Sequence, residues 1–264
     1  MFSYTIYERT CEITNNSIKE GDDVIIPEYI DGYKVTSIGE SAFSEGIYRN
    51  ITLPDTVLYI KYFAFSACVV SGTIHFPKYL KKIYNNAFWF CDVKSITLPD
   101  SLEKIGDHTF ANCTFSGTLT IPENVHFIGY GAFTNGLFDV LKFKTDKLKT
   151  IQPYTFVNCE NLSKTVVFPD SLREIGDRAF FNCGIENTVI NPIVDVHEDA
   201  FKWCVKLSPE YKKVFERTKI RAQKLIYFWI IQRLYRPGSD SAKRLAEASW
   251  KATLKDIEEF TQSY

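Results

Sequence analysis

Methionine and histidine are scarce in this 264-residue chain, which contains one Met and four His. The histidines, His75, His108, His126 and His197, have no second His or Cys at metal-ligand spacing on the same predicted element. A zinc site needs about four converging ligands, so these positions do not predict one. The sequence also lacks a glycine-rich phosphate loop, a nucleophile elbow and a Ser/His/Asp arrangement. We therefore predict a protein with no catalytic residues, no metal and no cofactor.

Net charge and long apolar runs are missing as well. The formal net charge of -1 argues against general binding to nucleic acid or to acidic membranes. No apolar segment approaches the roughly 20 residues that a bilayer-spanning helix requires. Residues 1–9 lack the basic and apolar regions of a signal peptide. We expect an intracellular, cytoplasmic protein without an integral membrane segment.

Phenylalanine, in contrast, is abundant and periodic. Eight phenylalanines recur at intervals of 22, 23, 22, 23, 23, 24 and 21 residues, namely Phe43, Phe65, Phe88, Phe110, Phe133, Phe156, Phe180 and Phe201. A β-branched residue stands five positions before each of them, and another aliphatic residue, from Val35 to Ile193, stands eight before. Periods of about 20–30 residues are typical of solenoids, in which each coil buries its apolar side chains against the next. We predict that the phenylalanines, the β-branched residues and the aliphatic residues all face inward.

Small side chains recur beside this phenylalanine column. Six of the seven cysteines follow a column Phe by three residues, and Gly46 and Gly136 take that position in two other repeats. The position therefore selects small volume, and we predict free, buried thiols, with a disulfide or a metal site as alternatives. Asparagines two residues after Phe, as in Asn112 and Asn135, are expected to bond the backbone of a tight corner. Gly106 and its equivalents are expected to permit the corner before Phe.

Short alternating segments predict one strand per coil. They are 51–53, 74–76, 96–98, 119–121, 141–143 and 166–168, and five of the six end at proline. Proline ends a strand because it has no N–H for the next backbone hydrogen bond. In the sixth repeat Lys144 takes the place of the proline. The strands should form a parallel sheet.

At this point the chain resembles a known family. The pattern Ile-Thr-Leu-Pro-Asp-Ser-Leu-x-x-Ile-Gly-x-x-x-Phe-x-Asn-Cys, at its clearest in residues 96–113, is similar to the BspA-like leucine-rich repeats. The resemblance covers residues 24–207, with a degenerate last copy at 189–192. It implies an α/β leucine-rich repeat fold, a right-handed solenoid of about eight repeats with a parallel β-sheet. It also implies a role in adhesion or protein–protein contact and no catalytic activity.

The two ends differ from the repeats. Residues 1–23 alternate around Asn15-Asn16, which predicts a β-hairpin that caps the first coil. In residues 208–264 the period stops, and Pro237-Gly238 separates two helical patterns, which predicts a helical hairpin that caps the other end. The first pattern, residues 211–236, is basic. It could instead dock an acidic partner, a membrane surface or a calmodulin-type protein.

Two outward rows are the candidate partner-binding residues. The first is threonine-rich and contains Thr52, His75, Thr97, Thr120 and Lys142. The second mixes aromatic residues with lysines and contains Tyr59, Lys82, Lys104 and Phe127. Aromatic residues among charged ones are typical of interaction hot spots, although both rows could be plain solvated surface. We expect a non-enzymatic scaffold that binds an unidentified protein through one face. The alternatives are a surface adhesin or carbohydrate-contacting protein, and an adaptor acting through the basic segment.

Overall fold

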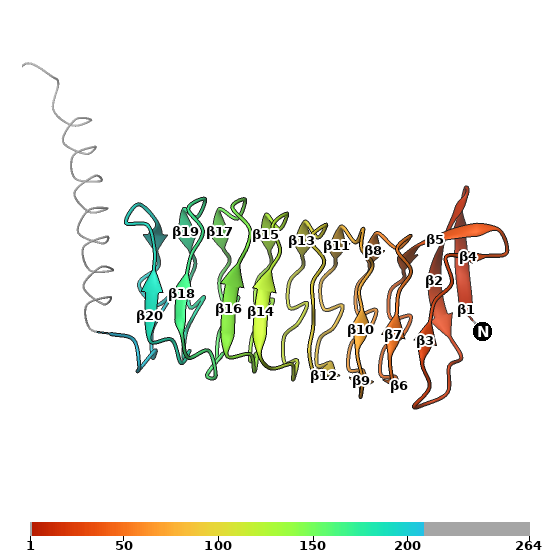
Figure 1. The fold of residues 1–264 in the computed structure, drawn as a ribbon, viewed down its shortest axis with the longest axis horizontal. Coiled ribbons are helices and arrows are strands. Elements are labelled where there is room, and N and C mark those ends of the chain that lie inside the picture. The colour runs from red at the N-terminus through yellow and green to blue at the C-terminus, as the bar shows by residue number, and fades with distance from the viewer. Residues whose placement is uncertain (1, 209–264) are drawn as a thin grey trace, which may run out of the picture. The chain divides into compact units, whose positions relative to one another are not determined.

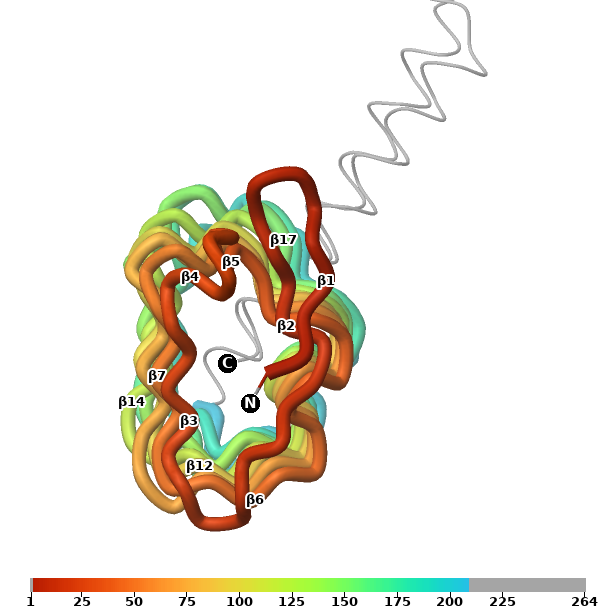
Figure 2. Tube along the Cα trace, turned by 90° about the vertical axis from the view of Figure 1, so that its right-hand side faces the viewer, coloured from red at the N-terminus to blue at the C-terminus, as the bar shows by residue number. Residues whose placement is uncertain are grey.

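The computed structural model describes residues 2–208 of the chain. The chain divides into two compact units, and the described residues lie in the first of them, Met1–Phe215. They form a solenoid of about eight coils (Figure 1), and each coil encloses an elongated cross-section (Figure 2). Within residues 2–208 the coils consist of strands and turns without a helix. The predicted helical hairpin and its basic segment 211–236 lie outside the described residues.

The coils contribute to three rows of strands, so the prediction of one strand per coil was wrong. The first row contains β3 (Val24–Ile25), β7 (Ile51–Thr52), β10 (Ile74–His75), β14 (Thr118–Ile121), β16 (Val140–Phe143), β18 (Thr165–Val167) and β20 (Asn187–Val189). The second row contains β8 (Tyr59–Ile60), β11 (Lys82–Ile83), β13 (Lys104–Ile105), β15 (Phe127–Ile128), β17 (Thr150–Ile151), β19 (Glu174–Ile175) and β21 (Asp195–Val196). The third row contains β6 (Ile47–Tyr48), β9 (Val69–Val70) and β12 (Asp92–Val93).

The first row is divided into three separate parallel sheets, β3-β7-β10, β14-β16 and β18-β20. Residues 96–98, predicted as a strand, are not assigned to one. The missing proline of the sixth repeat has a visible effect, because the Lys144 N–H donates to the Ile121 carbonyl at 2.9 Å. A proline could not make that bond. The β14–β16 pairing therefore extends over four residues.

The N-terminal hairpin consists of β1 (Phe2–Tyr7) and β2 (Thr10–Asn16), which pair antiparallel. Its turn lies at residues 8–9, and not at Asn15-Asn16 as predicted. Strand β2 then pairs in parallel with β5 (Tyr33–Ile38), which also pairs with β4 (Tyr29–Ile30). The Phe2 ring lies 6.2 Å from the Phe43 ring. The hairpin thus covers the apolar side chains of the first coil.

The phenylalanine column forms the centre of the core. Consecutive rings are stacked with centroids 5.0 to 5.5 Å apart and nearly parallel planes. All eight are buried, as the sequence predicted. Stacked pairs contribute about 0.5–1.5 kcal/mol each beyond the burial of their area. The column therefore joins every coil to its neighbours with one repeated contact.

Ile193 departs from the predicted inward set, because it is 56% exposed and Val194 is buried in its place. The Val194 N–H donates to the Asn191 carbonyl, the bond that Leu172 makes to Pro169 one coil earlier. Val196 then pairs with Ile175. Val194 and Val196 are two positions apart in the sequence, whereas Leu172 and Ile175 are three positions apart. The last coil is therefore one residue shorter between its two core positions.

The corner asparagines do not bond the backbone as predicted. Instead their side chains form a ladder from coil to coil, in which Asn135 donates to Asn112, Asn158 to Asn135 and Asn182 to Asn158. All four have a positive φ, between 55° and 60°. Asparagine tolerates this left-handed conformation better than most residues. Asparagine thus occurs at this position because of the backbone conformation. The amide ladder forms because stacking places the equivalent asparagines of successive coils next to one another.

The corner glycines have a different task from the one predicted. Gly106 and Gly129 are not among the residues with positive φ. A Cβ added to Gly129 would lie 2.5 Å from the Asp107 nitrogen and 2.6 Å from the Gly106 carbonyl carbon. These atoms belong to the backbone of the preceding coil. Glycine is therefore required for the close approach of two coils.

Candidate functional site

The second strand row brings Tyr59, Lys82, Lys104 and Phe127 directly side by side. Tyr59 pairs with Lys82, Lys82 with Lys104, and Lys104 with Phe127 across four parallel strands. Their neighbours Ile60, Ile83, Ile105 and Ile128 are buried. Because successive side chains of a strand point to opposite faces, the four candidates point outward. Tyr59 is 39% and Phe127 40% exposed. We call these four residues the aromatic–lysine strip.

An aromatic ring contacts one lysine of this strip, and an ion pair lies beside it. The Lys82 ammonium lies 3.9 Å from the centre of the Tyr84 ring. Lys81, on the adjacent position, donates to Glu103 at 2.7 Å, and this hydrogen bond lowers the pKa of Glu103. The strip ends at Phe127, because β15 does not pair with β17. Farther along, Glu174 pairs with Thr150 on one side and Asp195 on the other, so the row becomes acidic there.

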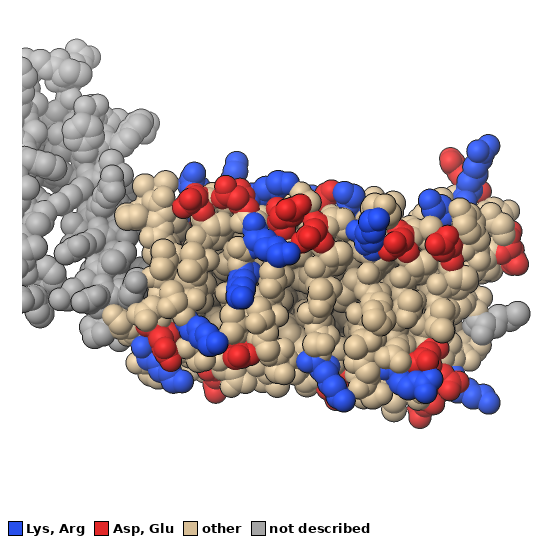
Figure 3. Space-filling model, viewed as in Figure 1, with Lys and Arg blue, Asp and Glu red and all other residues tan. Residues whose placement is uncertain are grey.

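The threonine-rich row is less continuous than the sequence predicted. Thr52 pairs with His75, and Thr120 pairs with Lys142, in two different sheets. Thr97 lies between these sheets and belongs to no assigned strand. The His75 ring nitrogen Nε2 lies 3.0 Å from the Thr73 hydroxyl. The charged residues on this side of the molecule gather along its two long edges and are few across its middle (Figure 3).

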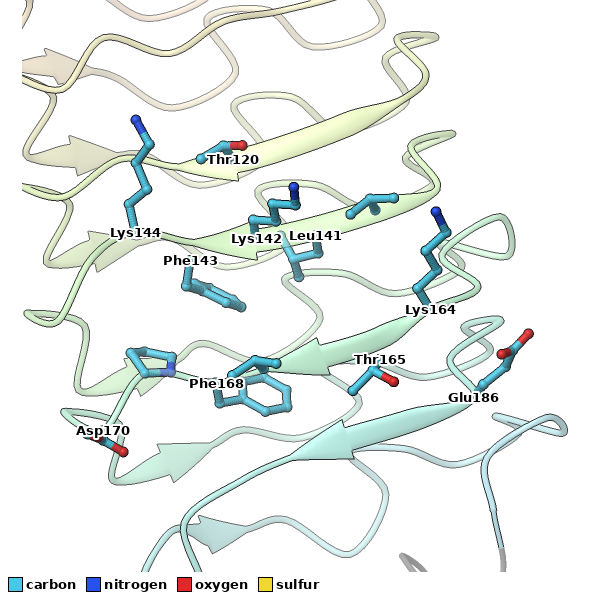
Figure 4. A pocket seen from close by; sticks show the side chains of 13 residues that line it. Thr120, Leu141, Lys142, Phe143, Lys144, Lys164, Thr165, Phe168, Asp170 and Glu186 are labelled. Carbon is cyan, nitrogen blue, oxygen red and sulfur yellow. The ribbon is translucent and has the colours of Figure 1, made fainter.

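A groove with a volume of about 1050 Å³ opens between β16 and β18 (Figure 4). Leu141, Phe143 and Phe168 form apolar parts of its wall. Lys142, Lys144 and Lys164 line it together with Asp170 and Glu186. The sequence pointed to Thr120 and Lys142 as outward residues but not to the groove itself. The one local signal was Lys144 at a position where the other five predicted strands end at proline.

Sequence reasoning also missed an exposed aromatic pair, Trp89 and Phe90. Their rings pack edge to face at 4.5 Å, and they are 38% and 51% exposed. Phe90 has a φ of 55°, a conformation that bulky side chains rarely adopt. The positions equivalent to Phe90 in the coils on either side hold Ala67 and Asn112, so the pair stands above smaller neighbours. This replacement of small residues by large ones was the available signal.

The cysteines are not candidates for chemistry. All seven are free and buried, and burial raises the pKa of Cys68 and Cys113 to about 12. Reactive cysteines need a stabilised thiolate and access to solvent, and these have neither. Among residues 2–208, no three His, Cys, Asp or Glu side chains converge as metal ligands. That same part of the chain also contains no helix with the length and hydropathy to cross a membrane.

Comparisons with known proteins agree with this geometry. The family model for the BspA type leucine rich repeat region matches six copies over residues 36–163 and 138–209. A leucine rich repeat protein of T. pallidum is similar in structure, with a TM-score of 0.60, 22% identity, and coverage of 82% of this chain and 92% of that chain. A leucine-rich repeat protein from Bacteroides ovatus has a TM-score of 0.59 and 25% identity, with coverage of 78% of this chain and 68% of that chain.

The search of curated proteins found no match. The family match nevertheless spans more than half of the chain, and its copies coincide with the stacked coils of the structure. The chain therefore belongs to the BspA-type leucine-rich repeat family.

Proposed function

We propose that this protein is a non-enzymatic scaffold that binds a protein partner through the aromatic–lysine strip. The family supports a protein-interaction or adhesin-like role at a coarse level. The observation that carries the finer proposal is the register of Tyr59, Lys82, Lys104 and Phe127 on four consecutive strands. Two exposed rings flank two lysines on a sheet that cannot easily deform, because every inward neighbour is packed in the core.

Such a strip suits a partner surface with carboxylates between apolar residues. Aromatic rings bury a large area at little conformational cost, and they dominate the energetics of many interfaces. The lysines add charge that favours an acidic partner and weakens binding as salt rises. The acidic residues Glu174 and Asp195 lie on separate strands of the same row and are not part of the proposed contact.

Affinity capture from an extract of the source cells, followed by mass spectrometry, tests this proposal. Wild-type protein is compared with the double variant Tyr59→Ala/Phe127→Ala. Each hot-spot truncation costs about 2 kcal/mol or more, so the double variant should lose the partner. The matched control is Ile47→Ala/Val69→Ala, which removes two exposed apolar side chains from the third row. Capture of the same proteins by all three would disprove a role for the strip.

A further inference from the structure

The residues that follow each column phenylalanine form a corner on the outside of the solenoid. This corner comes after the second strand row and lies across the coil from the first strand row (Figure 2). Backbone N–H groups of one corner donate to carbonyls of the next, in the bonds Phe90 to Ala111 at 3.0 Å, Asn112 to Thr134 at 2.8 Å, Asn135 to Val157 at 2.8 Å, Asn158 to Phe181 at 2.8 Å and Asn182 to Lys202 at 2.9 Å. These bonds keep one register, and we call Phe90, Asn112, Asn135, Asn158, Asn182 and Trp203 the corner row.

The middle of the corner row consists of four asparagines that keep unused hydrogen-bonding capacity. A side-chain amide has two N–H donors and two acceptor lone pairs. The ladder between the asparagines uses one donor and one lone pair of Asn135 and of Asn158. Asn158 is exposed, and the other three are half-buried. Donors and lone pairs therefore remain for a polar ligand at the spacing of stacked strands, about 4.8 Å.

An aromatic pair lies at each end of the corner row. Phe90 packs against Trp89 with ring centroids 4.5 Å apart, and Trp203 packs against Phe181 with centroids 4.9 Å apart. Phe90 is 51% and Trp203 64% exposed, with φ of 55° and 66°. This left-handed conformation is rare for bulky side chains, whereas the asparagines between them tolerate it. Neither core packing nor backbone conformation explains these rings, and strained residues of this kind are common at binding sites.

Charge and spacing decide which class of ligand suits the corner row. From Trp89 to Asn182, no residue of the row or directly before it in the sequence carries a charge. A nucleic acid, or a strongly acidic or basic peptide, would therefore meet no opposite charge along these positions. An extended peptide lying along the row would also lose register, because its residues repeat at about 3.3 Å and the coils at about 4.8 Å.

We propose that the corner row binds a linear, neutral oligosaccharide. The C–H face of a pyranose ring packs on an aromatic ring, and its hydroxyl groups exchange hydrogen bonds with amides. An extended chain of equatorially linked sugars repeats close to the coil spacing of about 4.8 Å, so successive sugars meet successive asparagines. The five steps from Phe90 to Trp203 span about 24 Å, the length of about five or six sugars. The inference goes beyond the proposed protein contact and shares no residue with the aromatic–lysine strip.

Isothermal titration calorimetry of the full chain with hexasaccharides of β-1,4-linked glucose, xylose and N-acetylglucosamine tests this inference. We expect saturable binding of at least one of them, with an affinity that salt does not change, because no charge pair forms. The double variant Trp89→Ala/Phe90→Asn should bind about tenfold more weakly or worse. It gives this coil the residues that the next coil carries at Ala111 and Asn112, so the solenoid should stay folded, and the melting temperature verifies this.

Three results would overturn the inference. The first is no binding of any of the three hexasaccharides up to about 1 mM. The second is unchanged binding by Trp89→Ala/Phe90→Asn. The third is equal affinity for the matching disaccharide, or for the α-1,4-linked glucose hexasaccharide, whose curved chain does not follow the coil spacing. Tyr59→Ala/Phe127→Ala should bind the hexasaccharide as wild type does, so a failure of the strip and a failure of the corner row are separately visible.

Discussion

The thiol of Cys113 donates a hydrogen bond to the main-chain carbonyl of Phe88 in the preceding coil, with 3.0 Å between sulfur and oxygen. The same relationship joins Cys68 to Phe43 and Cys183 to Phe156. The Phe88 carbonyl also accepts from the Cys91 N–H at 3.1 Å, so the thiol occupies the second lone pair of this oxygen. Cysteine therefore combines the small volume that the column requires with a donor for a carbonyl of the neighbouring phenylalanine. This explains the recurrence of sulfur in a column where alanine would also fit.

The first prediction concerns the pH dependence of stability. Burial raises the pKa of Cys113 from 9.0 to about 12. Below about pH 9 the thiol is neutral in the folded and the unfolded chain, and its contribution to stability is complete. Between about pH 9 and pH 12 only the unfolded chain releases the proton, so stability falls by up to about 1.4 kcal/mol per pH unit for this group.

Urea unfolding at about pH 8 and about pH 10 measures this effect. Wild type should lose about 1 kcal/mol more than Cys113→Ala between the two values, because the variant lacks the titrating group. The cavity cost of the substitution is the same at both pH values and cancels. An identical loss in both proteins would show that the thiol is not protected by burial.

The second prediction concerns the phenylalanine column. Phe110 is 1% exposed and lies between Phe88 and Phe133, with ring centroids 5.3 and 5.5 Å away. Phe110→Ala should lower the free energy of unfolding by about 3–5 kcal/mol, because it removes two stacking contacts and leaves a cavity. Chemical denaturation provides the measurement. Phe127→Ala, at a position 40% exposed, serves as the control and should change stability by about 0.5 kcal/mol or less.

The third prediction separates backbone conformation from side-chain bonding in the asparagine ladder. Asn135 has a φ of 57°, accepts from Asn158 and donates to Asn112. Asn135→Ala and Asn135→Gly both remove these bonds, but only glycine adopts a positive φ without strain. The alanine variant should be less stable than the glycine variant by about 1 kcal/mol in urea unfolding. Equal stability of the two variants would contradict this explanation.

The fourth prediction concerns the close approach of coils at Gly129. In Gly129→Ala the new Cβ would lie within 2.6 Å of backbone atoms of Asp107 and Gly106. Backbone atoms cannot relieve the clash by a change of rotamer, as a flexible side chain can. The two coils must therefore separate. We expect a loss of about 1–3 kcal/mol, typical of overpacked sites. Thermal unfolding of the variant measures it, and a melting temperature equal to that of wild type would show that the neighbouring coil moves freely.

Much of the core could be predicted from the sequence, because stacked coils place equivalent positions of every repeat next to one another. The spacing from Phe43 to Phe201 placed the rings, and the small residues three positions later placed the thiols. The second strand row was missed because strands of two residues, such as Lys82–Ile83, are too short for an alternating pattern. The asparagine ladder was missed because its bonds join side chains of different coils and depend on a left-handed backbone.

The sequence by itself determined the repeat, the family and the inward side chains, because a periodic apolar pattern can be buried only by stacking its copies. Only the tertiary structure decided where the strands pair and where they do not. The aromatic–lysine strip exists because four coils keep one register, and the groove exists because β16 and β18 do not pair. Both depend on the distance and alignment between neighbouring coils, which the sequence of a single repeat does not contain.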